Sequence, residues 1–218
     1  MLKPFLARSL FGVGIIAISG VGSPVFSQDV GITESLPAVE LVISGKAITI
    51  SRNQDQDARI DDEFAKTSRA CPPFCIHPMQ VAPGVATLGE LEVIDFLRDQ
   101  VVSGKGVLID SRLPEWNAKG TIPGAVNVPF ATLAPENPYR VEILKALGAK
   151  PLADGTLDFS AVMSVAMFCN GPWCDQSPRA IRYLTEAGFP PEKLFYYRGG
   201  MQDWLLLGLT VVKPNIEG

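Results

Sequence analysis

Residues 162–177 read VMSVAMFCNGPWCDQS, and this stretch decides which fold the chain adopts. Residues 162–168 are a short apolar run, typical of a strand that is buried on both faces of a parallel sheet. Cys169 follows directly, and a loop with Gly and Pro leads to Ser177-Pro178, where we expect the N-cap and first position of a helix. A strand, a loop with two cysteines and a helix in this order predict a site at the carboxyl end of the strand.

The same alternation of strands and helices begins near residue 84 and continues on both sides of this stretch. Strands are expected at residues 107–109, 125–128 and 194–197, in addition to 162–168. Helices are expected at residues 88–97, 141–147, 177–188 and 200–204. Strands separated by helices predict an α/β fold, with a parallel sheet and helices on both faces.

Residues 28–81 have a different pattern and are expected to form an N-terminal extension. Residues 39–50 alternate apolar and polar side chains around Gly45-Lys46. This predicts a small β-hairpin with Gly at the first central position of a type II′ turn. An isolated hairpin is marginal in water, so we expect it to pack on the main domain. An acidic connector follows at residues 53–63.

Residues 1–27 have the organisation of a secretory signal peptide. Lys3 and Arg8 precede an apolar run at residues 10–22, and Val25-Phe26-Ser27 supplies the cleavage site. The run is shorter than the about 20 apolar residues that span a bilayer. We therefore expect cleavage near Ser27, export to the periplasm, and no membrane attachment of the mature chain.

Composition restricts the partners and the chemistry. The chain has 19 basic and 23 acidic residues, a net charge of −4, and so has no electrostatic reason to bind nucleic acid or anionic membranes. His77 is the single histidine, which excludes mechanisms that need several imidazoles. Disulfides persist in exported proteins, so two close cysteine pairs are redox candidates: Cys71 with Cys75, and Cys169 with Cys174.

Cys169 is the candidate nucleophile because it lies between a strand end and a helix start. Unpaired backbone N–H groups and the helix dipole at such a place favour a thiolate or a bound anion. This chemistry requires neither a histidine nor a cofactor. The expected catalytic residues are Cys169 and Cys174. The expected substrate-binding residues are Asn170, Gly171, Trp173, Asp175, Gln176, Ser177 and Arg179.

Several separated motifs resemble the rhodanese family and occur in that family's order. They are Ile109-Asp110-Ser111-Arg112, Glu115, GTIPGAVNVP at residues 120–129, Phe168-Cys169, Gly188-Phe189, Gly199-Gly200 and Trp204. The resemblance implies a rhodanese-like domain over residues 82–218. It also implies that Cys169 takes a sulfane sulfur as a persulfide and passes it to a thiol or cyanide acceptor. Asp110 and Arg112 match positions with structural roles beside the site.

The sequence departs from the family's pattern in ways that bear on the substrate. The loop after Cys169 is about two residues longer than is usual, contains Cys174, and has Asp175 where a cation would help. A carboxylate at this place disfavours a dianionic donor such as thiosulfate. Arg179, in the next helical turn, is the candidate compensating charge. Thr121 stands where the family commonly has a histidine.

The two loop cysteines leave three functions open. The first is an exported sulfurtransferase, with a sulfane-sulfur donor and a thiol acceptor as partners. The second is a thiol–disulfide exchange protein in which Cys174 resolves what Cys169 carries, with a periplasmic redox protein as partner. The third is a non-catalytic rhodanese scaffold or metal-binding module whose N-terminal extension contacts a partner. A disulfide between Cys169 and Cys174 that only staples the loop is the structural alternative to a reactive cysteine.

The segment CPPFCIHPM at residues 71–79 also has several interpretations. Its Cys71, Cys75, His77 and Met79 side chains are soft ligands of the kind that suits copper. A disulfide or redox pair instead needs a turn at Pro73-Phe74, because an extended segment would hold the cysteines about 12 Å apart. Free structural thiols are the third interpretation. Trp173 is the aromatic residue of the Cys169 loop and is a candidate roof for a pocket.

Overall fold

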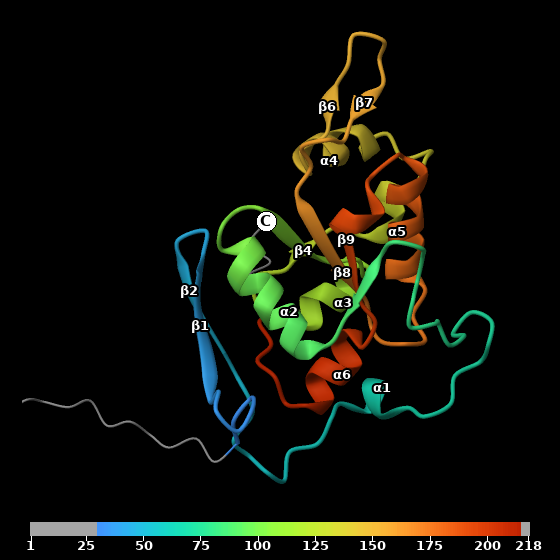
Figure 1. The fold of residues 1–218 in the computed structure, drawn as a ribbon. Coiled ribbons are helices and arrows are strands. Elements are labelled where there is room, and N and C mark those ends of the chain that lie inside the picture. The colour runs from blue at the N-terminus through green and yellow to red at the C-terminus, as the bar shows by residue number, and fades with distance from the viewer. Residues whose placement is uncertain (1–29, 215–218) are drawn as a thin grey trace, which may run out of the picture.

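The computed structural model describes residues 30–214 and shows an α/β fold around a five-stranded parallel sheet (Figure 1). The strand order is β3-β9-β8-β4-β5, and every neighbouring pair is parallel. The strands are β3 (Ala86–Leu88), β4 (Gly106–Asp110), β5 (Val126–Asn127), β8 (Ser164–Phe168) and β9 (Leu194–Tyr197). The predicted parallel sheet is therefore confirmed.

Helices cover both faces of this sheet. They are α2 (Glu90–Phe96), which continues as a π-helical segment (Leu97–Val101), α3 (Pro114–Lys119), α4 (Arg140–Ala146), α5 (Gln176–Glu186) and α6 (Gly200–Leu206). Short 3-10 turns occupy Phe130–Leu133 and Pro191–Lys193. A small antiparallel pair, β6 (Lys150–Pro151) and β7 (Leu157–Asp158), projects beyond α4 (Figure 1).

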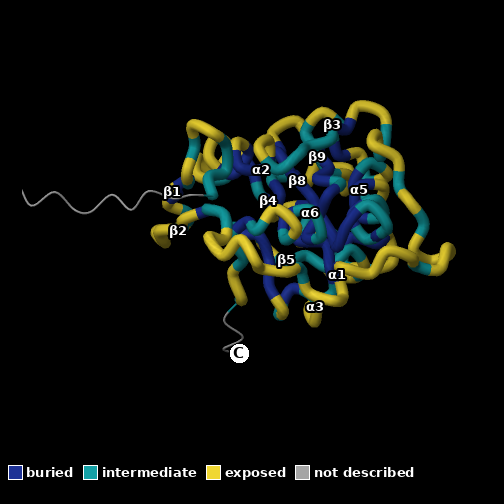
Figure 2. Tube along the Cα trace, turned by 90° about the horizontal axis from the view of Figure 1, so that it is seen from below, coloured by how far each residue is buried: buried dark blue, intermediate teal, exposed yellow. Residues whose placement is uncertain are grey.

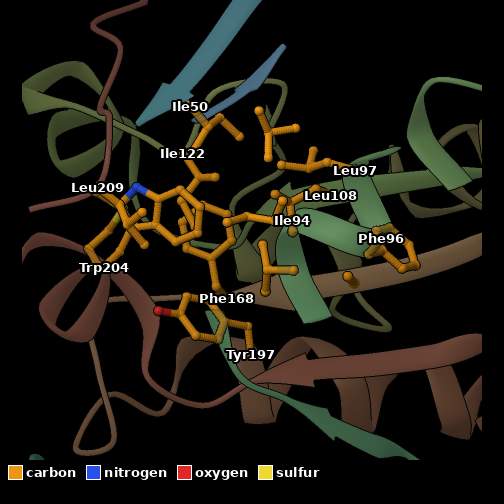
Figure 3. Packing of buried hydrophobic residues seen from close by; sticks show 14 of the residues in the cluster. Ile50, Ile94, Phe96, Leu97, Leu108, Ile122, Phe168, Tyr197, Trp204 and Leu209 are labelled. Atoms are coloured by element: carbon orange, nitrogen blue, oxygen red, sulfur yellow. The ribbon is translucent and has the colours of Figure 1, made fainter. Parts of the chain in front are cut away.

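The side chains of β8 alternate between two hydrophobic cores, one on each face of the sheet. Ala166 and Phe168 belong to the core that includes α2 and α6, whereas Val165 and Met167 belong to the core that includes α4 and α5. Figure 3 shows the first core, in which Phe168 and Trp204 lie among residues of the sheet, α2 and the N-terminal hairpin. Burial on both faces explains why residues 162–168 are apolar except for Ser164.

The N-terminal extension forms the predicted hairpin from β1 (Ala38–Ile43) and β2 (Lys46–Ser51). The hairpin packs on the first core through Val39, Leu41 and Ile50. The predicted turn type is wrong: Ser44 and Gly45 are the two central residues, with φ values of 51° and 76°. Two positive φ angles define a type I′ turn, which matches the twist of the strands. A short helix, α1 (Asp62–Ala65), follows.

Two helix starts differ from the prediction. Leu88 lies in the edge strand β3, where it pairs with Tyr197 of β9, and α2 begins at Glu90. Helix α5 begins at Gln176 with Asp175 as its N-cap, so Ser177 and Pro178 lie inside the first turn. Proline is tolerated there because the first-turn N–H groups have no partner within the helix.

The loop after β8 lies where the strand order reverses. From β4 the chain passes to β5 on one side, whereas β8 lies on the other side of β4 and is followed by β9. Asp110, at the end of β4, is in register with Phe168, at the end of β8. Ligands of open α/β sheets bind beside the carboxyl ends of strands at such a point. The topology therefore brings Cys169 to a position suited to binding.

Figure 2 shows the central strands buried and the segment between α1 and β3 exposed along the surface. The predicted signal peptide at residues 1–27 lies outside the described part of the chain. Within residues 30–214, no helix combines the length and the hydropathy needed to cross a bilayer.

Candidate active site

Cys169 follows β8 directly, and only 1% of its surface is exposed. The start of α6 holds the backbone here, because the N–H groups of Met201 and Gln202 donate to the carbonyl oxygens of Cys169 and Asn170, both at 2.9 Å. Gly200 has a φ of 58°, and a Cβ at this position would lie 2.4 Å from the Cys169 carbonyl oxygen. Only glycine permits this close approach. The Gly199-Gly200 motif therefore fixes the path of the loop.

Several hydrogen-bond donors converge on the Cys169 sulfur. Burial raises the pKa of this thiol, but the Cys174 thiol, the N–H and hydroxyl of Ser177, and the N–H of Gly171 would stabilise its thiolate and lower the pKa. Together they hold the pKa of Cys169 below its ordinary value. In the protonated form, its thiol donates to the Cys174 carbonyl oxygen at 3.2 Å. Cys169 is thus the more acidic thiol of the pair.

The Ser177 hydroxyl is placed to respond to charge on Cys169. Its oxygen is buried and has no hydrogen-bond partner within residues 30–214. A buried hydroxyl without a partner is costly, whereas a thiolate at Cys169 would accept a hydrogen bond from it. Because Ser177 lies in the first turn of α5, the helix dipole favours the same anion.

Cys174 is the second buried thiol of the site, and 5% of its surface is exposed. Both it and Cys169 are free in the structure. Donation to the Cys169 sulfur raises the pKa of Cys174 far above its usual range, and burial and the Cys169 charge add to this effect. The surroundings of the pair therefore favour the thiolate form at Cys169 and the protonated form at Cys174.

The other loop residues predicted to bind substrate lie in different surroundings. Asn170 is buried and turns toward the interior, where its Oδ1 lies 3.4 Å from Nη1 of Arg112. The N–H of Gln176 donates to the Cys174 sulfur. The Gln176 Oε1 is buried and lacks a hydrogen-bond partner in the described part of the chain. Asn170, Gly171 and Gln176 thus offer backbone donors to the two sulfurs, and the Asn170 side chain also ties the loop to the domain.

The two charged residues predicted at the site lie on the outside of α5. Arg179 and Asp175 form an ion pair of 3.8 Å and are each about two-fifths exposed. The Arg179 guanidinium also lies 4.4 Å from the centre of the Phe130 ring. Neither side chain is among the groups that shift the pKa of Cys169. Arg179 therefore does not compensate Asp175 at the sulfur itself.

Trp173 is an anchor for the N-terminal extension rather than the roof of an open pocket. Its Nε1 donates to the Gln202 side chain at 2.8 Å. The Arg69 guanidinium lies 3.7 Å from the centre of its ring, and the Phe74 ring meets it edge-on at 5.7 Å. Gln202 and Arg69 carry no sequence signal for this site, because each reaches the loop from a distant segment.

We call residues 69–79 the strap, because they run along the Cys169 loop. The His77 N–H donates to the Pro172 carbonyl oxygen at 2.9 Å, and Arg198 Nε donates to the His77 carbonyl oxygen at 2.9 Å. Within the strap, a disulfide joins Cys71 and Cys75, whose Cα atoms lie 4.7 Å apart. The strap therefore turns between Cys71 and Cys75, as a disulfide between these two residues requires.

The copper interpretation of the strap is not supported. Sulfurs that are bonded to each other are not thiolate ligands, so Cys71 and Cys75 do not offer the soft donors that this interpretation requires. No group of three or more His, Cys, Asp or Glu side chains within residues 30–214 is placed to hold a metal ion.

A buried ion pair between Arg112 and Asp110 lies beside the site. Arg112 Nε and Nη2 donate to the two carboxylate oxygens of Asp110 at 2.8 and 2.6 Å. Asn117 and Thr121 donate to the same carboxylate at 2.9 and 2.8 Å. Arg112 also donates to the Gly120 carbonyl oxygen at 2.6 Å. These contacts fit a structural role for Asp110 and Arg112, and Thr121 completes the network.

The chain is similar to known proteins over about half of its length. A curated relative, an HTH-type transcriptional regulator of Mycobacterium tuberculosis, is 29% identical over 109 residues, which are 50% of this chain and 38% of the regulator. The chain thus spans less than two-fifths of that relative's length.

Among solved structures, the human single-domain sulfurtransferase is 24% identical and has a TM-score of 0.37, with 56% of this chain and 96% of that one covered. A thiosulfate sulfurtransferase of Pseudomonas aeruginosa is 23% identical and has a TM-score of 0.39, with 59% of this chain and 20% of that one covered. The family model described as rhodanese-like domain matches residues 93–207, more than half of the chain. By this match, and with its cysteine at the end of a central parallel strand, the chain belongs to the rhodanese-like domain family.

Proposed function

We propose that the chain is an exported sulfurtransferase in which Cys169 carries a sulfane sulfur as a persulfide. The observation that carries the proposal is the position of Cys169, directly after β8 and before the first turn of α5, where backbone N–H groups favour a thiolate. The lowered pKa of this thiol agrees with that position. The thiolate is the nucleophilic form of cysteine. A buried thiol with no catalytic role would have a raised pKa and no reason to collect these donors.

The reaction has two displacement steps. The Cys169 thiolate attacks the sulfane sulfur of a donor R–S–SH, and the S–S bond of the donor breaks to give the Cys169 persulfide and R–S⁻. An acceptor thiolate then attacks the outer sulfur of the persulfide, which releases the Cys169 thiolate and leaves the acceptor as a persulfide. The N–H groups of Gly171 and Ser177 stabilise the anion at the start and at the end of the cycle.

Charge at the mouth of the site favours some sulfur-donor substrates over others. Asp175 is about two-fifths exposed beside the loop, and its ion pair with Arg179 is long, at 3.8 Å. This carboxylate repels a dianion more strongly than a monoanion. We therefore propose persulfides and polysulfides as donors in preference to thiosulfate, with a thiol as acceptor and no nucleic-acid partner.

Thiol–disulfide exchange is a second candidate, favoured by the contact between the two free thiols. Cys174 in its thiolate form would attack the inner sulfur of the persulfide, form a Cys169–Cys174 disulfide and release HS⁻. A periplasmic redox protein would then have to supply two electrons to restore the dithiol. The raised pKa of Cys174 makes this step slower than transfer to an external thiolate.

Variants of Cys174 separate its roles as donor and as resolving thiol. Cys174→Ala removes a hydrogen bond to the Cys169 thiolate and should move the pH profile of Cys169 alkylation by iodoacetamide to higher pH. Cys174→Ser keeps a hydroxyl donor and should leave the profile near that of the wild type. In the wild type, the inflection should lie below the value of about 8.5 for an ordinary cysteine.

The same two variants test the second candidate. If Cys174 resolves the persulfide, both substitutions should lengthen the lifetime of the Cys169 adduct, measured by mass at fixed pH. An unchanged lifetime in both variants would rule out the dithiol mechanism. A lower melting temperature with an unchanged lifetime would make Cys174 a structural residue only.

Export is tested separately from chemistry. Lys3, Arg8, the apolar run at residues 10–22 and the site at Ser27 predict a mature N-terminus at or near Gln28. Mass analysis of protein purified from the native host should find this end in the periplasmic fraction. An intact Met1 on cytoplasmic protein would contradict export.

A further inference from the structure

Tyr196 of β9 is a buried tyrosine whose hydroxyl has no hydrogen-bond partner within residues 30–214. The residue is fully buried, so the hydroxyl does not face solvent either. An unpaired buried hydroxyl is costly, and a phenylalanine would fill nearly the same space without that cost. A tyrosine at this position therefore points to a group that its hydroxyl meets in another state of the site.

The sheet places Tyr196 on the same face as Cys169. Tyr196 pairs with Met167 of the neighbouring strand β8, and both belong to the core that includes α5. Side chains two positions apart along a strand share a face, so Cys169, two residues after Met167, continues this face at the end of the strand. Tyr197 belongs to the core on the other face, and its hydroxyl donates to Oε1 of Glu90 at 2.9 Å. Of these two adjacent tyrosines, Tyr196 is therefore the one on the side of the thiols.

The charge of Cys169 acts on the Tyr196 hydroxyl, although no hydrogen bond joins the two groups. Burial raises the pKa of Tyr196, the charges of Cys169 and Cys174 raise it further, and the charge of Arg198 lowers it. These three residues are the charged or titratable groups that act on the hydroxyl, and their net effect keeps it protonated. The hydroxyl is therefore a donor that lies near the Cys169 sulfur without hydrogen bonding to it.

A persulfide would extend the anion of the site by one sulfur atom, at an S–S bond length of about 2 Å. We infer that the Tyr196 hydroxyl donates a hydrogen bond to this outer sulfur of the Cys169 persulfide. The inference rests on the proposed function. During transfer the acceptor thiolate bonds to the outer sulfur, the S–S bond breaks and its electron pair stays on Cys169. Tyr196 keeps its proton throughout, so its role is to stabilise and position the sulfur that is transferred.

Tyr196→Phe removes only the hydroxyl, and two alkylation profiles of the full chain test its role. The protein is loaded with sulfur from a polysulfide, and the rate at which iodoacetamide modifies the persulfide is followed by mass as a function of pH. The variant should move the inflection of this profile to higher pH by about one unit, a tenfold change that fits the loss of one hydrogen bond to a charged group. The profile of the Cys169 thiol without added sulfur should stay near that of the wild type, because Tyr196 does not hydrogen bond to it.

Tyr197→Phe is the matched control, because it makes the same change one residue along the strand. It breaks the hydrogen bond to Glu90, so it should lower the melting temperature and leave the persulfide profile unchanged. Tyr196→Phe should not lower the melting temperature of the sulfur-free protein, because the hydroxyl that it removes has no partner there.

The outcomes separate this inference from the proposed function. If Cys169 takes up sulfur but Tyr196→Phe leaves the persulfide profile unchanged, or Tyr197→Phe shifts it equally, the role of Tyr196 is wrong and the proposed function stands. A wild-type chain that takes up no sulfur at Cys169 would overturn both.

Discussion

Replacing Cys169 with serine should abolish sulfur transfer, with turnover reduced by a factor of at least ~10³, as is found when an enzyme loses its nucleophile. A serine hydroxyl does not form a persulfide. The hydrogen-bond donors of Ser177 and Gly171 would then have no thiolate to stabilise at this position. Steady-state transfer from a polysulfide to a low-molecular-weight thiol measures the effect. Full activity in this variant would show that sulfur is carried elsewhere.

Cys71→Ser is the matched control for that experiment. It also exchanges one cysteine for serine, but in the strap disulfide rather than in the loop. We expect it to retain sulfur transfer. The two cysteines of this disulfide are only 4 positions apart, so the bond closes a short loop. Loss of a loop of this length lowers stability by about 2 kcal/mol through the greater entropy of the unfolded chain. Both variants should therefore be assayed at a temperature where each remains folded.

Arg112→Met should lower the free energy of unfolding by about 3–5 kcal/mol, the cost of breaking a buried ion pair by removing one partner. Asp110 is fully buried and would be left with only the N–H of residue 112 and the Asn117 and Thr121 side chains as donors. Urea denaturation measures the change. Asp110→Asn in the Arg112→Met background should recover part of the loss, because it removes the uncompensated charge.

Arg98→Met is the control for this stability experiment. Arg98 also pairs with aspartates, at 2.9 and 3.0 Å, but its side chain and both partners are more than half exposed. Exposed pairs contribute little to stability. We expect the denaturation midpoint of Arg98→Met to stay near that of the wild type. Equal effects of Arg98→Met and Arg112→Met would contradict the supporting role assigned to the Asp110–Arg112 pair.

The fold was predictable because its strands differ from their surroundings in local sequence. Residues 162–168 are apolar except for Ser164, and the structure buries the strand Ser164–Phe168 on both faces of the sheet. Turn and boundary details were less predictable, because they depend on contacts between distant segments. Leu88 fits the helical spacing of residues 88–97, but pairing with Tyr197 draws it into β3. Tertiary pairing outweighed local periodicity at this position.

The site was predictable in its nucleophile but not in its surroundings. Cys169 stands out because it follows a buried strand and precedes a helix. The sequence alone does not show that Trp173 is held by Arg69 and Phe74, since the strap approaches from about a hundred residues away in the chain. Nor does it show that Arg179 turns outward over Phe130. Side-chain direction on a helix start depends on the whole fold.

The most direct test of the central claim locates the added sulfur. Reduced protein is incubated with a polysulfide, digested, and analysed by mass spectrometry with fragmentation between Cys169 and Cys174. We expect one added sulfur on Cys169, removable by dithiothreitol and absent from the Cys169→Ser variant. Sulfur found on Cys71 or Cys75 instead, or on no cysteine at any pH at which the protein is folded, would contradict it.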